Sequence, residues 1–214
     1  MAIKAVIFDF DGTIIDTETI WFHVFEELLK EKFNIDLPLE EFAKSIGTTD
    51  EVFFQYLEAQ TGMKIDADEI NRLASDRFLE KRGILGVREG VVEKLEEARE
   101  LGFRIGLASS SSREWVEGFL KQFKLWQYFS VIKTREDVDK VKPDPALYLK
   151  ALEALQVEPQ EALAIEDSIN GAIAAIEAGM KCIVIPNQVT SFLNFDDKTL
   201  RSESFVDFNF KQYI

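Results

Sequence analysis

Two aspartates stand one residue apart in the stretch IFDFDGT, residues 7–13, at the end of an apolar run. One carboxylate of such a pair could attack phosphorus and form an aspartyl phosphate, because carboxylates are competent nucleophiles in this chemistry. The second acid could protonate the leaving alkoxide and then activate water, as a general acid and base does. The stretch therefore predicts a site of phosphoryl transfer near the start of the chain.

Polar residues also stand together at three later places in the sequence. These stretches are Ser109 to Ser111, Lys142-Pro143 and Glu166-Asp167-Ser168. Crowded carboxylates cannot all stay ionised unless a cation neutralises them, and hard oxygen ligands favour Mg²⁺. Each group alone is typical of a turn or a helix cap. Their recurrence along the chain favours one shared site that holds a metal.

The elements that must position these groups are short apolar runs with the character of buried strands. The runs cover 4–8, 104–108, 162–165 and 182–185, with a weaker one at 130–134. Helical periodicity fills 89–101, 112–123 and 168–178. This alternation predicts an α/β fold in which a mostly parallel sheet has helices on both faces. Because the carboxyl ends of parallel strands share one edge, the polar groups should converge there.

Residues 17–82 interrupt the alternation with helical periodicity alone. Helices are predicted at 20–33, 39–45, 49–60 and 66–82. The segment carries many phenylalanines at helical spacing, which favours a packed interior over a binding surface. We therefore expect an all-helical insertion directly after the first strand. At the far end of the chain, the stretch FVDFNF at 205–210 predicts a last edge strand.

The composition limits the partners of the protein. Over 214 residues the formal net charge is −14, which argues against nucleic acid and against anionic membranes as partners. An anionic substrate would need a cation or a local cluster of donors. No secretory signal pattern is present, no apolar run approaches the roughly 18 residues that cross a bilayer, and Cys182 is the one cysteine. We expect a cytoplasmic monomer without a disulfide inside the chain.

The four polar groups, in this order, resemble the four motifs of the haloacid dehalogenase superfamily. The matching residues are Asp9-Phe10-Asp11-Gly12-Thr13, Ser109, Lys142-Pro143 and Glu166-Asp167-Ser168-x-x-Gly171. With an insertion after the first motif, the chain resembles the branch that contains β-phosphoglucomutase and many small-molecule phosphatases. The resemblance spans residues 3 to 187. It implies a Rossmann-like, doubly wound core at 1–16 and 83–214, and an inserted all-helical cap domain at 17–82.

The resemblance also implies a role for each motif residue. Asp9 would be the nucleophile and Asp11 the general acid and base, while Ser109 and Lys142 would hold the transferring phosphate. Asp9, Asp11 through its backbone carbonyl, and Asp167 would be Mg²⁺ ligands, with Glu166 either binding alongside them or ordering a metal-bound water. Candidate substrate-binding residues are Gly12, Thr13, Ser110 and Arg113 in the core, and Gly47, Thr48, Thr49 and Asp50 in the cap.

Three departures from the family pattern bear on the choice within this branch. Mutase-type members carry a histidine after the first motif where this chain has Trp21, and a cap arginine where it has Asp50. The lysine that follows their second-motif serines is replaced by Ser112 and then Arg113. An acid is unfavourable where a second phosphate should bind. We therefore rank a phosphohydrolase above a β-phosphoglucomutase-type mutase.

The expected substrate is a small phosphorylated metabolite. Hydroxyls and an acid in the loop at 47–50 suit a sugar or polyol better than a second phosphate. One alternative of a different class is a phosphoacceptor receiver module, which also has an acidic metal pocket on a doubly wound sheet. Receivers carry the acceptor aspartate on a later strand and have no helical insertion. A catalytically silent binding protein on this fold is a further alternative, although every motif acid is present.

Overall fold

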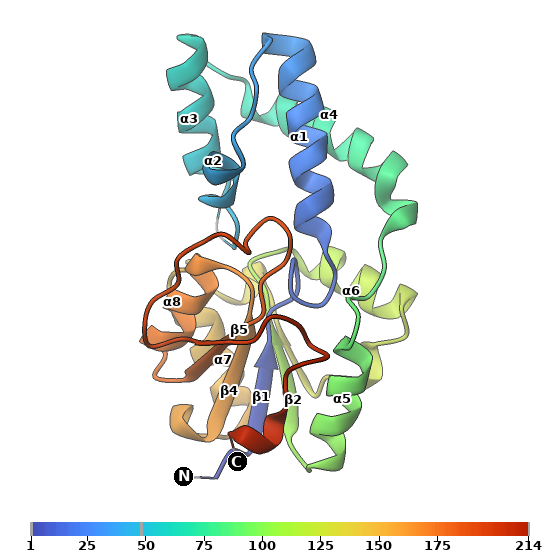
Figure 1. Ribbon diagram of the computed structural model, residues 1–214, viewed down its shortest axis with the longest axis vertical. Helices are drawn as coiled ribbons and strands as arrows, with labels where there is room; N and C mark the ends of the chain where they lie inside the picture. Colours follow the sequence, from blue (N-terminus) through green and yellow to red (C-terminus); the bar gives the residue numbers. More distant parts are fainter. Residues whose placement is uncertain (1, 48, 214) are drawn as a thin grey trace.

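A parallel sheet forms the centre of the molecule (Figure 1). The computed structural model describes residues 2–47 and 49–213. Within them the strands are β1 (Ala5–Phe8), β2 (Arg104–Ala108), β3 (Val131–Lys133), β4 (Ala162–Glu166), β5 (Lys181–Val184) and β6 (Leu200–Arg201). Their order is β3-β2-β1-β4-β5-β6, and each neighbouring pair is parallel. The predicted Rossmann-like sheet is confirmed.

Both faces of the sheet are buried, as alternate residues of β1 show. Val6 and Phe8 belong to one hydrophobic cluster, which includes the apolar faces of helices α5 (Val91–Glu100) and α6 (Arg113–Gln122). Ala5 and Ile7 belong to a second cluster, with helices α7 (Ala146–Leu155) and α8 (Ile169–Glu177). Successive side chains of a strand point to opposite faces, so both faces need apolar residues. The core is therefore doubly wound.

The helices of the core begin where the sequence places polar caps. Ser112 accepts a hydrogen bond from the backbone N–H of Trp115 at the start of α6, and Ser168 accepts one from Gly171 at the start of α8. The predicted helices at 89–101, 112–123 and 168–178 are confirmed to within a few residues. Helix α7 occupies a stretch for which no element is predicted. Its only buried polar side chain, Tyr148, has a part in the site.

Four helices between β1 and the rest of the core form the helical insertion, residues 17–82. They are α1 (Thr17–Phe33), α2 (Leu39–Ala43), α3 (Glu51–Thr61) and α4 (Ala67–Lys81). Figure 1 shows them together at one end of the molecule, beyond the carboxyl ends of the strands. Phenylalanines fill the interior of this group, and the rings of Phe25 and Phe53 lie 4.8 Å apart. The all-helical character expected of residues 17–82 is present.

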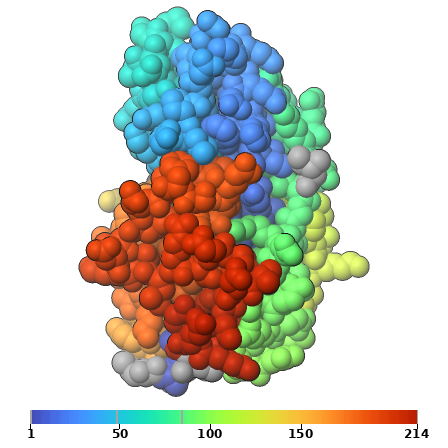
Figure 2. All heavy atoms as spheres, viewed as in Figure 1, coloured from blue at the N-terminus to red at the C-terminus, as the bar shows by residue number. Residues whose placement is uncertain are grey.

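The C-terminal segment corrects one prediction. Residues 205–210 do not form a strand; they form a turn that leads into a short 3₁₀ helix (Phe210–Gln212), and the edge strand is β6. Phe205, Phe208 and Phe210 are nevertheless buried, whereas Val206 is exposed. Side chains on one face of a strand recur at every second residue, and these three phenylalanines do not keep that spacing. They instead hold a segment without regular secondary structure against the cluster that contains α5. Figure 2 shows this segment across the front of the molecule.

The remaining described elements are short. Further 3₁₀ helices cover Arg82–Ile84, Trp126–Tyr128, Arg135–Asp137 and Pro159–Glu161. Among the residues that the structure describes, no helix combines the length and apolar character needed to span a bilayer. Cys182 is buried in β5 with a free thiol, as expected of a small apolar core residue.

Candidate active site

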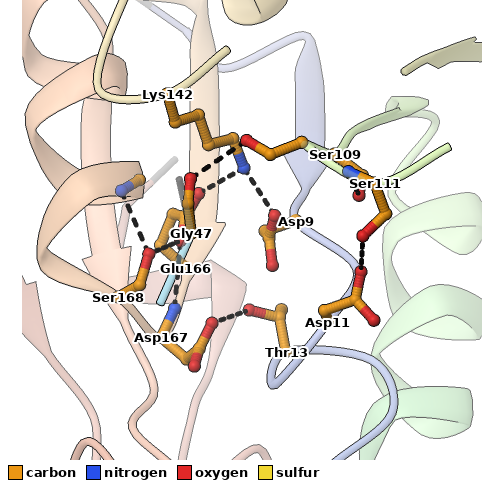
Figure 3. Close-up of polar contacts among 12 residues, drawn as sticks. Asp9, Asp11, Thr13, Gly47, Ser109, Ser111, Lys142, Glu166, Asp167 and Ser168 are labelled. Atoms are coloured by element: carbon orange, nitrogen blue, oxygen red, sulfur yellow. Dashed lines mark hydrogen bonds and ion pairs between the residues drawn. The ribbon is translucent and has the colours of Figure 1, made fainter. Parts of the chain in front are cut away.

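The polar groups predicted from the sequence meet at the carboxyl ends of β1, β2 and β4 (Figure 3). Asp9 directly follows β1, and its backbone N–H donates to the carbonyl oxygen of Ile165 in β4 at 2.9 Å. This bond places the Asp9 side chain beside Glu166, the last residue of β4. Asp9 and Glu166 are both buried. Adjacent parallel strands thus bring together acids that are far apart in sequence.

Lys142 lies at the centre of this group and has no solvent exposure. Its Nζ atom donates to Oδ1 of Asp9 at 2.5 Å and to Oε1 of Glu166 at 2.6 Å. Burial alone would lower the pKa of Lys142, but the charges of Asp9 and Glu166 outweigh burial and raise it. Both carboxylates therefore favour the ammonium form of this side chain. It lies 4.9 Å from the ring centroid of Tyr148, whose hydroxyl donates to the same oxygen of Glu166 at 2.6 Å.

Asp9, Glu166 and Asp167 form a buried carboxylate cluster that could hold a metal. One oxygen from each lies within 4.8 Å of the others. Burial raises the pKa of Asp9 to about 7, with the attraction of Lys142 opposing and the charge of Glu166 adding to the effect. Burial, Asp9 and Glu166 likewise raise the pKa of Asp167 well above its usual range. One ammonium leaves this cluster with excess negative charge, and hard carboxylate oxygens suit a divalent cation such as Mg²⁺.

Asp167 is oriented by residues of two loops. Thr13 donates to its Oδ1 at 3.0 Å, and the side-chain amide of Asn187 donates to its Oδ2 at 2.7 Å. Gly12 has φ +76°, and a Cβ there would lie 2.3 Å from Oδ2 of Asp167. Gly12 and Thr13, predicted to bind substrate, thus pack against the carboxylate cluster and do not line the cavity described below. Asn187 was not predicted, although it follows the carboxyl end of β5 as the other site residues follow their strands.

Glu166 is held in place by the start of helix α8. Its Oε2 accepts from the hydroxyl of Ser168 at 3.2 Å and from the backbone N–H of Asp167 at 3.3 Å. Gly171 lies one helical turn further on, where a Cβ would fall 2.0 Å from the carboxylate of Glu166. The glycine of the fourth motif is therefore required by close approach of a side chain, since any larger residue would displace Glu166.

Asp11 points to a different set of partners because the chain turns after Phe10. Oδ1 accepts from the Thr17 hydroxyl and from Nε1 of Trp115, both at 2.8 Å, and Oδ2 accepts from the Ser111 hydroxyl at 2.5 Å. Burial raises the pKa of Asp11, and the hydrogen bonds from Ser111, Trp115 and Thr17 partly oppose it. A raised pKa suits a carboxyl that must carry a proton near neutral pH.

A cavity of about 220 Å³, the inner cavity, opens between these residues and the helical insertion. The predicted site residues that line it are Asp9, Asp11, Ser109, Ser110, Gly47 and Asp50. Thr49 lines an adjoining outer cavity together with Asp50. Thr48 lies outside the described residues. Arg113 lines neither cavity, because its guanidinium pairs with Asp137 at 2.6 Å.

Several lining residues of the inner cavity were not predicted to bind substrate, and Glu18, Trp21 and Phe42 are among them. Glu18 and Trp21 come from the first turns of α1, and Phe42 from α2. Burial raises the pKa of Glu18 well above its usual range, and the charges of Asp11, Asp9 and Asp16 add to this. Four carboxyl groups line the inner cavity, and none of its described lining residues is Lys or Arg. Arg135 lines the outer cavity.

The helical insertion contacts the core at the rim of the inner cavity. The Ser110 hydroxyl donates to the carbonyl oxygen of Gly47 at 3.0 Å, and the side-chain amide of Asn170 donates to that of Ile46 at 2.7 Å. A Cβ at Gly47, where φ is +78°, would lie 2.5 Å from Oγ of Ser168. The loop at 46–47 thus lies directly against two motif serines of the core. His23, the one histidine, lies away from both cavities and pairs with Glu26 on the surface of α1.

Comparison with known proteins agrees with this geometry. The family model described as haloacid dehalogenase-like hydrolase matches residues 6–185. YhcW of Bacillus subtilis (strain 168), which is named as a candidate phosphatase, is 48% identical over 206 residues, covering 96% of this chain and 93% of its own. The chain belongs to the haloacid dehalogenase-like hydrolases. Within that family it is an enzyme of the phosphatase class.

Two solved structures show the same fold. CbbY from Rhodobacter sphaeroides, in complex with xylulose-(1,5)bisphosphate, has a TM-score of 0.79 and 29% identity, with 96% of each chain covered. A candidate β-phosphoglucomutase from Thermotoga maritima has a TM-score of 0.70 and 25% identity, with 95% of each chain covered. Both similarities extend over the helical insertion as well as the core.

Proposed function

We propose that this protein is a Mg²⁺-dependent phosphatase that hydrolyses a sugar or polyol phosphate through an aspartyl phosphate on Asp9. The observation that carries the proposal is the convergence of Asp9, Lys142, Glu166 and Asp167 in one buried cluster beneath the inner cavity. Ser109 lines the same cavity at the end of β2. A nucleophile, a fixed cation and a hydroxyl are thus available to one phosphate group.

The proposed reaction has two steps. An oxygen of Asp9 attacks phosphorus as the bond from phosphorus to the leaving oxygen breaks, and Asp11 donates its proton to that oxygen. Asp11, now a carboxylate, then removes a proton from water, which attacks the aspartyl phosphate and releases inorganic phosphate. Lys142 stabilises the negative charge of the transferring group, and the helical insertion over the cavity would limit the access of other nucleophiles.

The metal would be held by Asp9, Glu166 and Asp167, with the backbone carbonyl of Asp11 as a further ligand. Their chemistry fits a hard divalent cation, because one lysine offsets only part of the charge of three buried carboxylates. When bound, Mg²⁺ would neutralise this excess charge and polarise the phosphate oxygens. Thr13 and Asn187 would keep Asp167 oriented towards the ion, since both donate to its carboxylate.

The lining of the inner cavity supports a leaving group without an anion. Asp50 would repel a carboxylate or second phosphate, and the carboxyl groups of Asp50 and Glu18 can both form hydrogen bonds with hydroxyls. Trp21, Phe25 and Phe42 offer apolar faces of the kind that pack against sugars. We propose that residues 17–82 act as a cap domain over a core of 1–16 and 83–214. Side chains of this cap would recognise the leaving group of the substrate. The cytoplasmic location and the monomeric state stay predictions.

A β-phosphoglucomutase-type mutase is the second candidate function. Arg135 favours it, because an arginine on the outer cavity could bind a second phosphate. The similarity to a protein named as a candidate β-phosphoglucomutase agrees with this reading. Asp50 opposes it, since this acid lines both cavities and would repel the same phosphate.

Phosphate release from a panel of monophosphate esters tests the proposal. We expect release from sugar and polyol phosphates that needs Mg²⁺, stops in EDTA and is abolished in Asp9→Asn. Asp139→Asn, at an acid outside the site, is the matched control and should retain wild-type activity. Isomerisation of β-glucose 1-phosphate in the presence of a bisphosphate primer, without net phosphate release, would establish the mutase instead. No turnover of either kind would refute both functions.

A further inference from the structure

Trp115 makes a direct contact with Asp11 that the motif residues do not account for. Its Nε1 atom donates to Oδ1 of Asp11 at 2.8 Å, across 104 residues of sequence. An indole N–H can only donate a hydrogen bond, so the oxygen that it contacts must be an acceptor. The hydroxyls of Thr17 and Ser111, which are the other partners of Asp11, can donate or accept. Trp115 is therefore the one partner in this set that distinguishes the two carboxyl oxygens.

The indole is held rigidly in position. Trp115 lies in the first turn of α6, where its backbone N–H is capped by Ser112. Its ring packs edge-on against Phe119 at a centroid distance of 4.9 Å and lies 5.2 Å from Phe78 of α4. Phe78 in turn stacks on Trp21 of α1 at 4.3 Å. Aromatic rings from the core and from the helical insertion thus pack against the indole, which limits its freedom to turn away from Asp11.

We propose that Trp115 is a positioning residue that occupies Oδ1 of Asp11 as a hydrogen-bond donor, so that Oδ2 carries the proton delivered to the leaving group. This role rests on the proposed function, in which Asp11 is the general acid. The proton passes from Oδ2 to the leaving oxygen as the phosphorus–oxygen bond breaks and the bond to Asp9 forms. Ser111, which lines the inner cavity and contacts Oδ2, marks the side from which the proton leaves.

Dependence on the leaving group separates this role from general support of the fold. β-Glycerophosphate releases a basic alkoxide that needs a proton, whereas p-nitrophenyl phosphate releases a stable phenolate that needs none. Trp115→Phe keeps an aromatic ring and removes the N–H. We expect kcat/KM for β-glycerophosphate, which reports phosphoryl transfer to Asp9 and not the later hydrolysis common to both substrates, to fall about 10- to 100-fold, the value of one hydrogen bond to a charged group. We expect the loss for p-nitrophenyl phosphate to be no more than about threefold.

Three further variants make the result decisive. Asp11→Asn is the benchmark, and it should show the same preference for p-nitrophenyl phosphate in stronger form. Trp126→Phe is the matched control, because Trp126 is a partly exposed tryptophan outside both cavities, and it should leave both activities unchanged. Phe78→Leu keeps the indole but removes a ring that packs on it. It should also lower activity more for β-glycerophosphate than for p-nitrophenyl phosphate, with a smaller loss than in Trp115→Phe. This variant provides the test if Trp115→Phe does not fold.

The outcomes distinguish the positioning role of Trp115 from the proposed mechanism in which Asp11 is the general acid. Equal losses for both substrates in Trp115→Phe, or in Phe78→Leu if that variant is used, would overturn the positioning role while leaving the phosphatase in place. If Asp11→Asn itself shows no dependence on the leaving group, then Asp11 is not the general acid and the proposed mechanism fails first.

Discussion

Nζ of Lys142 lies 2.5 Å from Oδ1 of Asp9 and 2.6 Å from Oε1 of Glu166, with no exposure to solvent. The lysine joins the first and fourth motifs through a single charged atom. A buried ion pair of this kind is costly to break, because the partner left behind is an unpaired charge away from water. The contact therefore links the stability of the protein to the group that would bind phosphate.

Replacing Lys142 with methionine should destabilise the metal-free protein. The free energy of unfolding should fall by about 3–5 kcal/mol in EDTA, because Asp9 and Glu166 lose the ammonium between them. Mg²⁺ should restore part of the loss. Urea unfolding with and without Mg²⁺ measures both effects. Lys150→Met, at an exposed lysine of α7, is the control and should change stability by less than about 0.5 kcal/mol. Equal effects of the two substitutions would contradict the structural role of Lys142.

Magnesium should stabilise the wild-type protein through Asp167. A ligand that binds only the folded state at about 100 times its Kd adds about 2.7 kcal/mol, which would raise Tm by about 5–10 °C in a chain of this size. Asp167→Asn should lose most of this shift, and Asp139→Asn should keep it. Differential scanning calorimetry with and without MgCl₂ provides the measurement. A full shift in Asp167→Asn would place the ion elsewhere.

Position 171 should not accommodate a residue larger than glycine without a loss of stability. Gly171→Ala places a methyl group 2.0 Å from the carboxylate of Glu166, so we expect a loss of about 1–3 kcal/mol in stability and weaker Mg²⁺ binding. Gly118→Ala in α6 is a matched helical substitution with open space around it, and should stabilise by up to about 1 kcal/mol. Chemical denaturation compares the pair. Similar effects at both sites would mean that Glu166 moves freely.

The stability of the metal-free protein should depend on the ionisation of Asp9. Its pKa is raised from 3.8 to about 7, chiefly by burial, so the folded state holds this proton more tightly than the unfolded state. Stability in EDTA should therefore fall as pH rises from about 4 to about 7. Asp9→Asn carries no titrating proton and should lose less stability over this interval. Thermal unfolding of both proteins across the pH range checks the sign, and parallel curves would contradict it.

Substrate selection should respond to the acids of the inner cavity. Asp50→Asn should raise kcat/KM for phosphoglycolate relative to β-glycerophosphate by about fivefold, because it removes about 1 kcal/mol of repulsion from an anionic leaving group. Glu18→Gln should change this ratio less, because the raised pKa of Glu18 favours its neutral form. Arg135→Gln should act in the opposite direction if the outer cavity takes part. Relative kcat/KM over both substrates is the measurement. Unchanged ratios in all three variants would remove these side chains from substrate recognition.

The parallel α/β core and the residues at its functional edge can be predicted from the order of residues along the chain. Buried strands appear as short apolar runs, and polar side chains that can act in catalysis follow each run at its carboxyl end. Because the carboxyl ends of parallel strands share one edge of the sheet, the positions of Asp9, Ser109 and Glu166 along the chain predict that they lie close together. The composition of residues 17–82 likewise indicates helices. The prediction of a last edge strand at 205–210 is wrong, because the three buried phenylalanines of that stretch anchor a turn.

The side chains that orient the site and those that line the inner cavity become evident only in the folded molecule. Trp115 reaches Asp11 from 104 residues away, and Tyr148 reaches Glu166 from the buried face of a helix, so no local spacing predicts either contact. Gly12 and Thr13 belong to a catalytic motif but pack against Asp167. Such contacts depend on the packing of whole elements against one another. The order of residues along the chain determines the elements, but their packing determines the neighbours of each side chain.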